Sequence, residues 1–132
     1  MTRYVITPEV ALRLAEEGAV ARAEHQLLAP ALIRSQLLAR LHQAVRQGEL
    51  TKKDAERRLD HVRRLRLRLL GDRVLQRVAW SIADQLGWDD TFAAEYVALT
   101  QLQADALVTL DGELARSVEG VVALAPFEAL TS

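Results

Sequence analysis

The sequence lacks several features on which common classes of protein depend. None of its 132 residues is cysteine, which excludes disulfides, thiolate metal sites and a cysteine nucleophile. No glycine-rich phosphate loop occurs among its six glycines, and no serine lies in the glycine-flanked turn of a hydrolase nucleophile. Its apolar runs are far shorter than a membrane span, and "MTRYVITPEV" has no secretory apolar region. We therefore expect a cytoplasmic protein that does not bind membranes.

Histidine and aromatic residues are also sparse. His25, His42 and His61 have no histidine or cysteine neighbour at metal-ligand spacing, so surface or packing roles are expected of them. Only 5% of the residues are aromatic, which leaves few rings to stack on nucleic-acid bases. Trp80 falls on an apolar helical pattern and is predicted to lie in the core, and Trp88 is predicted to pack over a helix junction.

Half of the residues are hydrophobic and 27% are charged, which is enough for a core in one domain spanning residues 1–132. The net charge of −1 conceals a segregation of charge along the chain. Residues 33–73 hold twelve Arg and Lys against five acids, a balance of +7, whereas residues 84–132 hold nine acids against Arg116 alone, a balance of −8. Such a chain can bind an anion at one end and a basic partner at the other, or the charges can simply keep helix faces solvated.

The hydrophobic periodicity alternates between short strands and amphipathic helices. Strands are predicted at residues 3–6, 25–30, 65–70, 106–110 and 121–124, with helical segments between them. Strands joined through helices form a mostly parallel sheet covered on both faces. The sequence therefore predicts an α/β protein, a three-layer α/β/α domain with a mostly parallel five-stranded sheet.

Two polar residues follow predicted strands at points where ligands bind in such sheets. Ligands of open α/β sheets bind beyond the carboxyl ends of the strands. Thr7 follows the first predicted strand and precedes Pro8, a typical helix start in which Thr7 would be the N-cap. Asp111 follows the fourth predicted strand and precedes Gly112. We expect Thr7 and Asp111 to lie near each other at one edge, where Asp111 either caps a helix or belongs to a site.

Three segments in order, "YVITPEVAL", "LLAPALIRSQLLARL" and "LGWDDTFAAEYVALTQLQADALVTLDGELA", resemble the PIN-domain family, in particular VapC-type toxins of toxin–antitoxin pairs. The resemblance extends over nearly the whole chain. It implies the PIN-like fold and the activity of active members, which are Mg²⁺- or Mn²⁺-dependent endoribonucleases. It also implies a homodimer and an antitoxin-like protein partner. The hard cations of these enzymes take oxygen ligands and activate a water for attack on phosphorus.

The resemblance breaks at the residues that would hold the metal. Active members bring together four carboxylates, and this sequence has Thr7, Gln36 and Ala93 at three of those positions. Asp111 of "VTLD" is the only family acid that remains. We therefore expect a degenerate catalytic site.

Neighbouring acids offer only partial substitutes for the missing ones. Glu9 lies in the first turn after Pro8, where an acid favours the helix dipole. Glu95 lies two residues from Ala93 and so projects from a different helix face. Asp90 shares the face of Ala93 and, with Asp111, is a candidate metal ligand, although it is also placed to cap the helix that begins near Thr91.

A basic segment is the candidate for nucleic-acid binding. It places six arginines within twelve positions: Arg57, Arg58, Arg63, Arg64, Arg66 and Arg68. These side chains can neutralise phosphates, or they can be a solvated helix surface and a strand edge protected from aggregation.

These observations predict a PIN-like protein related to toxin ribonucleases that has little or no nuclease activity and acts by binding RNA or a protein partner. It needs no cofactor unless it is active, in which case the cofactor is Mg²⁺ or Mn²⁺. Two alternatives remain open. One is an active metal-dependent endoribonuclease toxin that uses Asp111 with unusual ligands, and the other is a structural or regulatory interaction module without nucleic-acid contact.

Overall fold

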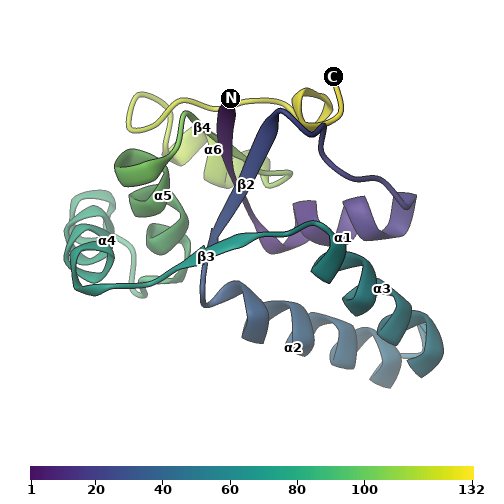
Figure 1. Cartoon of the computed structure of the whole chain (residues 1–132). Helices are drawn as coiled ribbons and strands as arrows, with labels where there is room; N and C mark the ends of the chain where they lie inside the picture. Colours follow the sequence, from purple (N-terminus) through teal and green to yellow (C-terminus); the bar gives the residue numbers. More distant parts are fainter.

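The computed structural model describes residues 1–132, and strands alternate with helices along the chain (Figure 1). The elements, in order, are β1 (Thr2–Ile6), α1 (Pro8–Glu17), β2 (His25–Pro30), α2 (Ile33–Arg46), α3 (Lys52–Arg64), β3 (Arg68–Leu70), α4 (Arg73–Leu86), α5 (Phe92–Gln103), β4 (Ala106–Val108), α6 (Gly112–Ser117) and the 3₁₀ turn η1 (Phe127–Leu130). Sequence signals set many of these boundaries. Thr51, for example, caps α3 by accepting a hydrogen bond from the Asp54 amide, and Gly18 ends α1 at a φ of 65°.

The four strands form one parallel sheet in the order β3-β2-β1-β4. Tyr4 pairs with Leu27 on one side and with Ala106 on the other, so β1 and β2 occupy the centre of the sheet. Because all strands run the same way, their carboxyl ends meet at one edge. Thr7, Ala31 and Thr109 directly follow β1, β2 and β4 at that edge.

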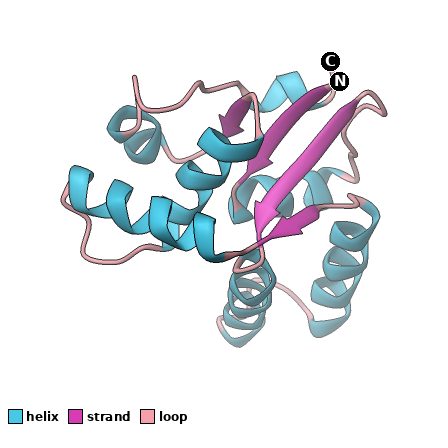
Figure 2. Cartoon of the chain, turned by 60° about the vertical axis from the view of Figure 1, so that its left-hand side comes forward, coloured by secondary structure: helices cyan, strands magenta, loops and turns pink.

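Helices cover the sheet on both sides, as the two views of the chain show (Figures 1 and 2). On one side, α5 packs on β1, β2 and β4, and α4 packs on the outside of α5. On the other side, α1, α2 and α3 pack against one another. The predicted three-layer α/β/α architecture is therefore confirmed.

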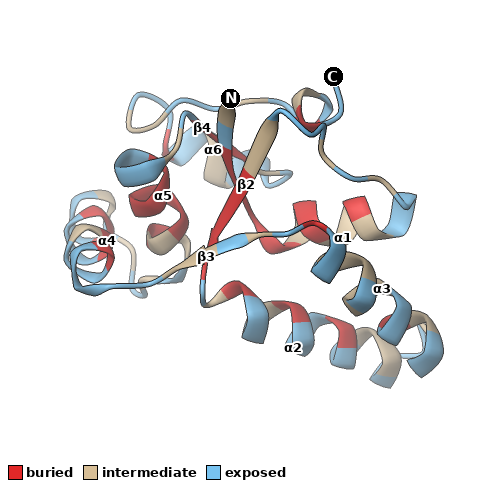
Figure 3. Cartoon of the chain, in the orientation of Figure 1, coloured by how far each residue is buried: buried red, intermediate tan, exposed pale blue.

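Burial is concentrated where the sheet meets its helices (Figure 3). The ends of β1 and β4, Val5–Ile6 and Leu107–Val108, are fully buried, as is usual for strands covered on both faces. Helix α5 is buried on nearly every side from Ala94 to Thr100, because it lies between the sheet and α4. No helix is both long enough and apolar enough to cross a membrane.

Two strand predictions need correction. The predicted fifth strand at 121–124 is a loop that makes only a single bridge to β4, between Leu124 and Leu107, so the sheet has four strands. The predicted strand at 65–70 is shorter, because Leu65 is the buried end of α3 and Arg66 turns the chain with a φ of 54°. Only Arg68–Leu70 then pairs with β2.

The prediction that Trp80 lies in the core is wrong. In α4 the buried positions are Leu75, Ala79, Ile82 and Ala83, which face α5. Trp80 is one residue beyond Ala79, about 100° further around the helix, and 68% of it is exposed. Trp88, by contrast, is half-buried and packs against the core after the end of α4, as predicted.

Candidate functional site at the carboxyl edge of the sheet

The carboxylate of Glu9 is the centre of a polar network at the carboxyl edge of the sheet. Its Oε1 accepts hydrogen bonds from the Thr7 hydroxyl at 2.6 Å, the Thr109 hydroxyl at 2.9 Å and the Leu110 amide at 3.4 Å. Its Oε2 lies 3.9 Å from Nη1 of Arg40 on α2. One carboxylate therefore ties together the residues that follow β1 and β4, and it faces a guanidinium from the next helix.

Thr7 does not cap α1 through its side chain, contrary to the prediction. Its hydroxyl donates to Glu9 and accepts no helix amide, while its backbone carbonyl accepts from the amides of Val10 and Ala11. The residue is buried, with 3% of its surface exposed. The hydroxyl is a donor here because the nearest partner is an acceptor-only carboxylate.

Asp111 is the N-cap of α6. Its Oδ1 accepts hydrogen bonds from the amides of Glu113 at 3.0 Å and Leu114 at 3.2 Å. Its own amide donates to the Thr109 hydroxyl at 3.1 Å, and that hydroxyl in turn donates to Glu9. The predicted convergence of Thr7 and Asp111 on one edge is thus visible, with Glu9 and Thr109 between them.

Gln36 takes part in a second hydrogen bond at this edge. The Tyr96 hydroxyl on α5 donates to Oε1 of Gln36 on α2 at 2.6 Å, so it links helices on opposite sides of the sheet. Burial and the nearby charge of Glu9 raise the pKa of the Tyr96 hydroxyl well above its usual range, and Arg40 only partly offsets this. Burial also raises the pKa of Glu95, which lies beside it in sequence. Tyr96 is therefore a permanent donor to Gln36 at neutral pH.

The two candidate metal ligands lie on the wall of one hollow. Asp90 and Asp111 line it together with Ala93, Asp89 and Glu113, and its volume is 410 Å³. Asp90 is not the N-cap of α5 as predicted, because the cap position is Thr91. Its carboxylate accepts the Phe92 amide at 3.1 Å from one residue earlier, so both candidates already accept backbone amides.

The donor set does not fit a divalent cation. No group of three or more His, Cys, Asp or Glu side chains has the arrangement of a metal site. The oxygens of Glu9 and Asp111 that lie at the edge are directed to hydroxyls and amides, and Arg40 is the charged group that faces Glu9. Because Mg²⁺ requires several oxygens in near-octahedral geometry, we derive no metal-dependent step for this edge.

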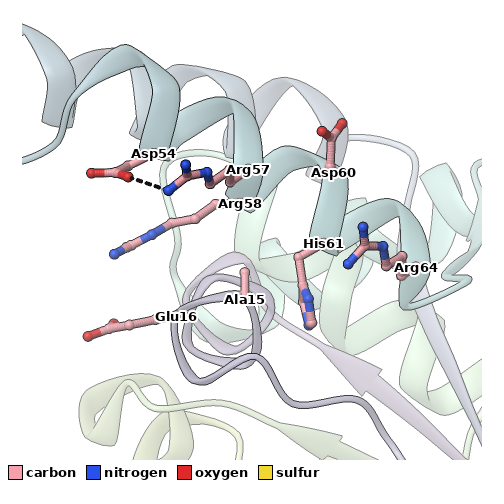
Figure 4. Close-up of a pocket in the computed structure, with 8 residues that line it drawn as sticks. All are labelled: Ala15, Glu16, Asp54, Arg57, Arg58, Asp60, His61 and Arg64. Atoms are coloured by element: carbon pink, nitrogen blue, oxygen red, sulfur yellow. Dashed lines mark hydrogen bonds and ion pairs between the residues drawn. The ribbon is translucent and has the colours of Figure 1, made fainter.

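The structure separates the six arginines of the candidate nucleic-acid segment. Arg57, Arg58 and Arg64 line a hollow of 580 Å³ between α3 and α1, where Arg58 and His61 project toward α1 (Figure 4). His61 is bonded there to the carbonyl of Ala19 at 2.7 Å. Acids share this hollow, and Arg57 lies 3.5 Å from Asp54.

The other three arginines lie elsewhere. Arg63 and Arg66 line an apolar groove beside α2, where Arg63 is paired with Asp60. Arg68 is exposed on β3, the edge strand. The segment is therefore not a single basic face.

Sequence reasoning missed three residues of the edge network and misjudged a fourth. Arg40 lies one helical turn after Gln36 on α2, and Thr109 directly follows β4, so topology alone could have placed both. Tyr96, whose helical spacing is typical of a core residue, is buried and is also a hydrogen-bond donor. Glu9 was weighed as a partial substitute for the missing acids and interpreted as a helix-dipole acid, yet it is the most connected side chain at the edge.

The architecture is that of a PIN-like fold, and two solved structures share it. PAE2754 from Pyrobaculum aerophilum matches with a TM-score of 0.72 and 22% identity over 98% of this chain and 93% of its own. A chain of VapBC2 from Rickettsia felis, in a structure of VapBC2 bound to a DNA fragment from its promoter, matches with a TM-score of 0.63 and 12% identity. The match covers 94% of this chain and 98% of that one. No protein-family model and no curated protein matches the sequence. The structural similarity establishes the fold. At these low sequence identities it does not establish an activity.

Proposed function

We propose that this protein is a PIN-like domain that acts by binding and does not cleave RNA. The observation that carries the proposal is the donor set at the carboxyl edge of the sheet, with Thr7, Gln36 and Ala93 at three positions where the PIN resemblance implies acids. The two carboxylates that remain nearby, Glu9 and Asp111, accept five hydrogen bonds from within the chain. A bound cation would have to compete with those bonds and with the positive charge of Arg40.

A cleavage assay with a labelled single-stranded RNA and Mn²⁺ tests this proposal. We expect no product whose formation depends on Asp111. The matched variants are Asp111→Ala, which removes both cap and charge, and Asp111→Asn, which keeps a capping oxygen. Cleavage by the parent protein that both variants abolish would overturn the proposal, whereas product that persists unchanged in both comes from another nuclease.

Thermal unfolding gives an independent test of the same site. Any ligand that binds only the native state stabilises it. We expect millimolar Mg²⁺ or Mn²⁺ to leave the melting temperature of the parent nearly unchanged. An increase of several degrees that Asp111→Asn removes would instead indicate a metal site.

A protein partner is a second candidate for what is bound, and one surface favours it. A groove of 580 Å³ between α2 and α3 is lined mostly by apolar side chains, including Leu38, which is 59% exposed. Arg34 and Arg63 lie on its walls. An antitoxin-like segment that carries apolar and acidic side chains fits this chemistry, and the PIN resemblance implies such a partner.

Co-expression with the product of the adjacent upstream gene tests the partner. We expect the tagged chain to co-purify with that product, and Leu38→Asp to abolish the complex. Leu102→Asp, at an exposed leucine on α5, is the matched control and should leave the complex intact. Equal recovery with both variants would show that the groove is not the binding surface.

A further inference from the structure

The most exposed aromatic side chain of the molecule lies on its outermost helix. Helix α4 contacts the rest of the chain through α5, and its opposite side is exposed to solvent (Figures 1 and 3). Trp80, on that side, is 68% exposed, while the other tryptophan, Trp88, is half-buried. An indole has a large apolar face that can stack on a flat ligand, so what surrounds Trp80 decides whether it belongs to a binding surface.

Arginines precede Trp80 on the same face of α4. Arg73 and Arg77 lie seven and three residues before it, which is the spacing of neighbours on one helix face. Both are exposed, and neither forms an ion pair in a chain where five other arginines do. Their charges are therefore free to meet an anion.

The same chemistry continues backward into the edge strand. Arg68, on β3, is exposed and also without an acidic partner. The chain passes from β3 directly to α4 along the outside of the molecule (Figure 1). We refer to these four residues, Arg68, Arg73, Arg77 and Trp80, as the β3–α4 surface.

No acidic residue forms an ion pair with the arginines of this surface. Asp72 lies between β3 and α4, and its carboxylate is directed to the backbone, where it caps the helix by accepting the Leu75 amide at 2.9 Å. Asp84 lies one turn beyond Trp80 and marks the end of the basic stretch. The surface therefore carries three arginines without an ion pair and one exposed aromatic ring.

We propose that the β3–α4 surface binds single-stranded nucleic acid, with Trp80 stacked on an unpaired base and the arginines in contact with the phosphates. An indole on a convex helix reaches a base face only where the base is unpaired, which favours a single strand over a duplex. This proposal deepens the proposed function, because it names the ligand and the surface that binds it. It rests on the proposed function in one respect, namely that the bound strand is not cleaved. It uses no residue of the Glu9 network.

Binding measured in EDTA keeps the test independent of any metal-dependent activity. The probes are a fluorescently labelled oligouridylate, its deoxy counterpart and a duplex RNA of the same length. We expect both single strands to bind better than the duplex, and preference for the ribose form would show that 2′-hydroxyls are recognised. In the Trp88→Phe variant, Trp80 is the sole tryptophan, and its fluorescence should be quenched as the strand binds.

Substitutions separate the stacking contribution from the charge contribution. Trp80→Ala should weaken binding roughly five- to a hundredfold, while Trp80→Phe should restore part of the loss. The double variant Arg73→Ala/Arg77→Ala should reduce the slope of log affinity against log salt by about 1.4, since each phosphate contact of a single strand contributes about 0.7. The control is Arg46→Ala, an exposed and unpaired arginine in the last turn of α2, which should leave the slope unchanged.

Two results would overturn the proposal. One is the absence of salt-dependent binding by the folded parent, and the other is an affinity of Trp80→Ala equal to that of the parent. If Trp80→Ala instead dissociates an oligomer of the chain and leaves strand binding intact, the surface is a contact between copies and the proposal is also wrong. Cleavage dependent on Asp111 would contradict the proposed function alone, so the two failures are distinguishable.

Discussion

Asp111 caps α6 and also stands where the PIN resemblance implies a family acid, and these two roles predict different responses to substitution. Its carboxylate accepts the amides of Glu113 and Leu114. Asp111→Ala should lower the free energy of unfolding by about 1 kcal/mol, because a short side-chain acceptor at an N-cap contributes that much. Asp111→Asn should cost only a fraction of this, because asparagine caps as well as aspartate does. Urea unfolding of both variants in metal-free buffer measures the difference, and equal losses would contradict the capping role.

Tyr96 predicts a loss of stability in alkali. Burial and the charge of Glu9 raise the pKa of its hydroxyl in the folded state above the ordinary value of 10.0. The unfolded chain therefore loses this proton at a lower pH than the folded chain does. Once the pH exceeds about 10, the unfolded state binds fewer protons, so the free energy of unfolding falls as the pH rises.

Tyr96→Phe provides the comparison, because it removes the titrating group and keeps the ring. The variant is less stable at neutral pH, since Gln36 loses its donor. Above pH 10 its free energy of unfolding should fall less steeply than that of the parent, as measured by urea unfolding across the alkaline range. Parallel curves for the two proteins would show that the Tyr96 hydroxyl ionises in the folded state as it does in the unfolded chain.

At the scale of elements, the end of α1 depends on one glycine. Gly18 has a φ of 65°, and a Cβ added there would meet no atom within 4 Å. Gly18→Ala should therefore destabilise the protein by about 1 kcal/mol through backbone conformation alone. The matched control is Gly112→Ala in the first turn of α6, where φ is not in the left-handed region and the nearest atom to an added Cβ is 3.6 Å away. Chemical unfolding should show a loss for the first variant and none for the second.

The sequence was sufficient for most elements because their signals are local. Caps, glycine stops and helical periodicity placed the helices, and compact apolar runs placed β1, β2 and β4. The predicted strand at 65–70 extended too far because the alternation of Leu65 and Leu67 with Arg66 imitates a strand. In the structure Leu65 is the buried C-cap of α3, and Arg66 turns the chain. The burial of Leu65 depends on tertiary contacts that the local pattern does not show.

The site was predictable only as far as topology determines it. The carboxyl-end rule brought Thr7 and Asp111 to one edge, because parallel strands must end together. The role of Glu9 could not be deduced, because topology brings Thr109 to the same edge but does not determine the direction of the Glu9 side chain. Trp80 was misplaced because the helical pattern does not determine the exact rotation of α4. One residue, about 100° around the helix, separates the buried Ala79 from the exposed Trp80.

At the scale of the whole molecule, the fold holds two surfaces with different chemistry. The polar side chains at the carboxyl edge form hydrogen bonds with one another, whereas the arginines of the β3–α4 surface form no ion pair. The charge segregation seen in the sequence therefore corresponds to distinct places on the structure: the hollow with Asp90 and Asp111 is acidic, and β3 with the start of α4 is basic. Binding at the basic surface requires no metal at the acidic one.

Introducing acids at the three positions where the PIN resemblance implies them tests whether this fold can hold a metal ion. The triple variant Thr7→Asp, Gln36→Glu and Ala93→Asp places carboxylates beside Glu9 and Asp111. Without metal it should unfold at a lower temperature than the parent, because like charges crowded at one edge repel one another. With Mn²⁺ at about ten times its dissociation constant the variant should gain about 1.4 kcal/mol, which is a rise of about 3–5 °C in its melting temperature.

The parent protein, carried through the same scan, should show no comparable rise, since its carboxylates are held by hydroxyls and amides and Arg40 faces Glu9. Arg40→Ala in the triple background should increase the response further, because it removes the one positive charge that opposes a cation there. An equal response of parent and triple variant to Mn²⁺ would mean that Thr7, Gln36 and Ala93 are not what prevents metal binding. In that case Thr7, Gln36 and Ala93 do not determine the function of this edge, and the binding function proposed for the molecule would lose its main support.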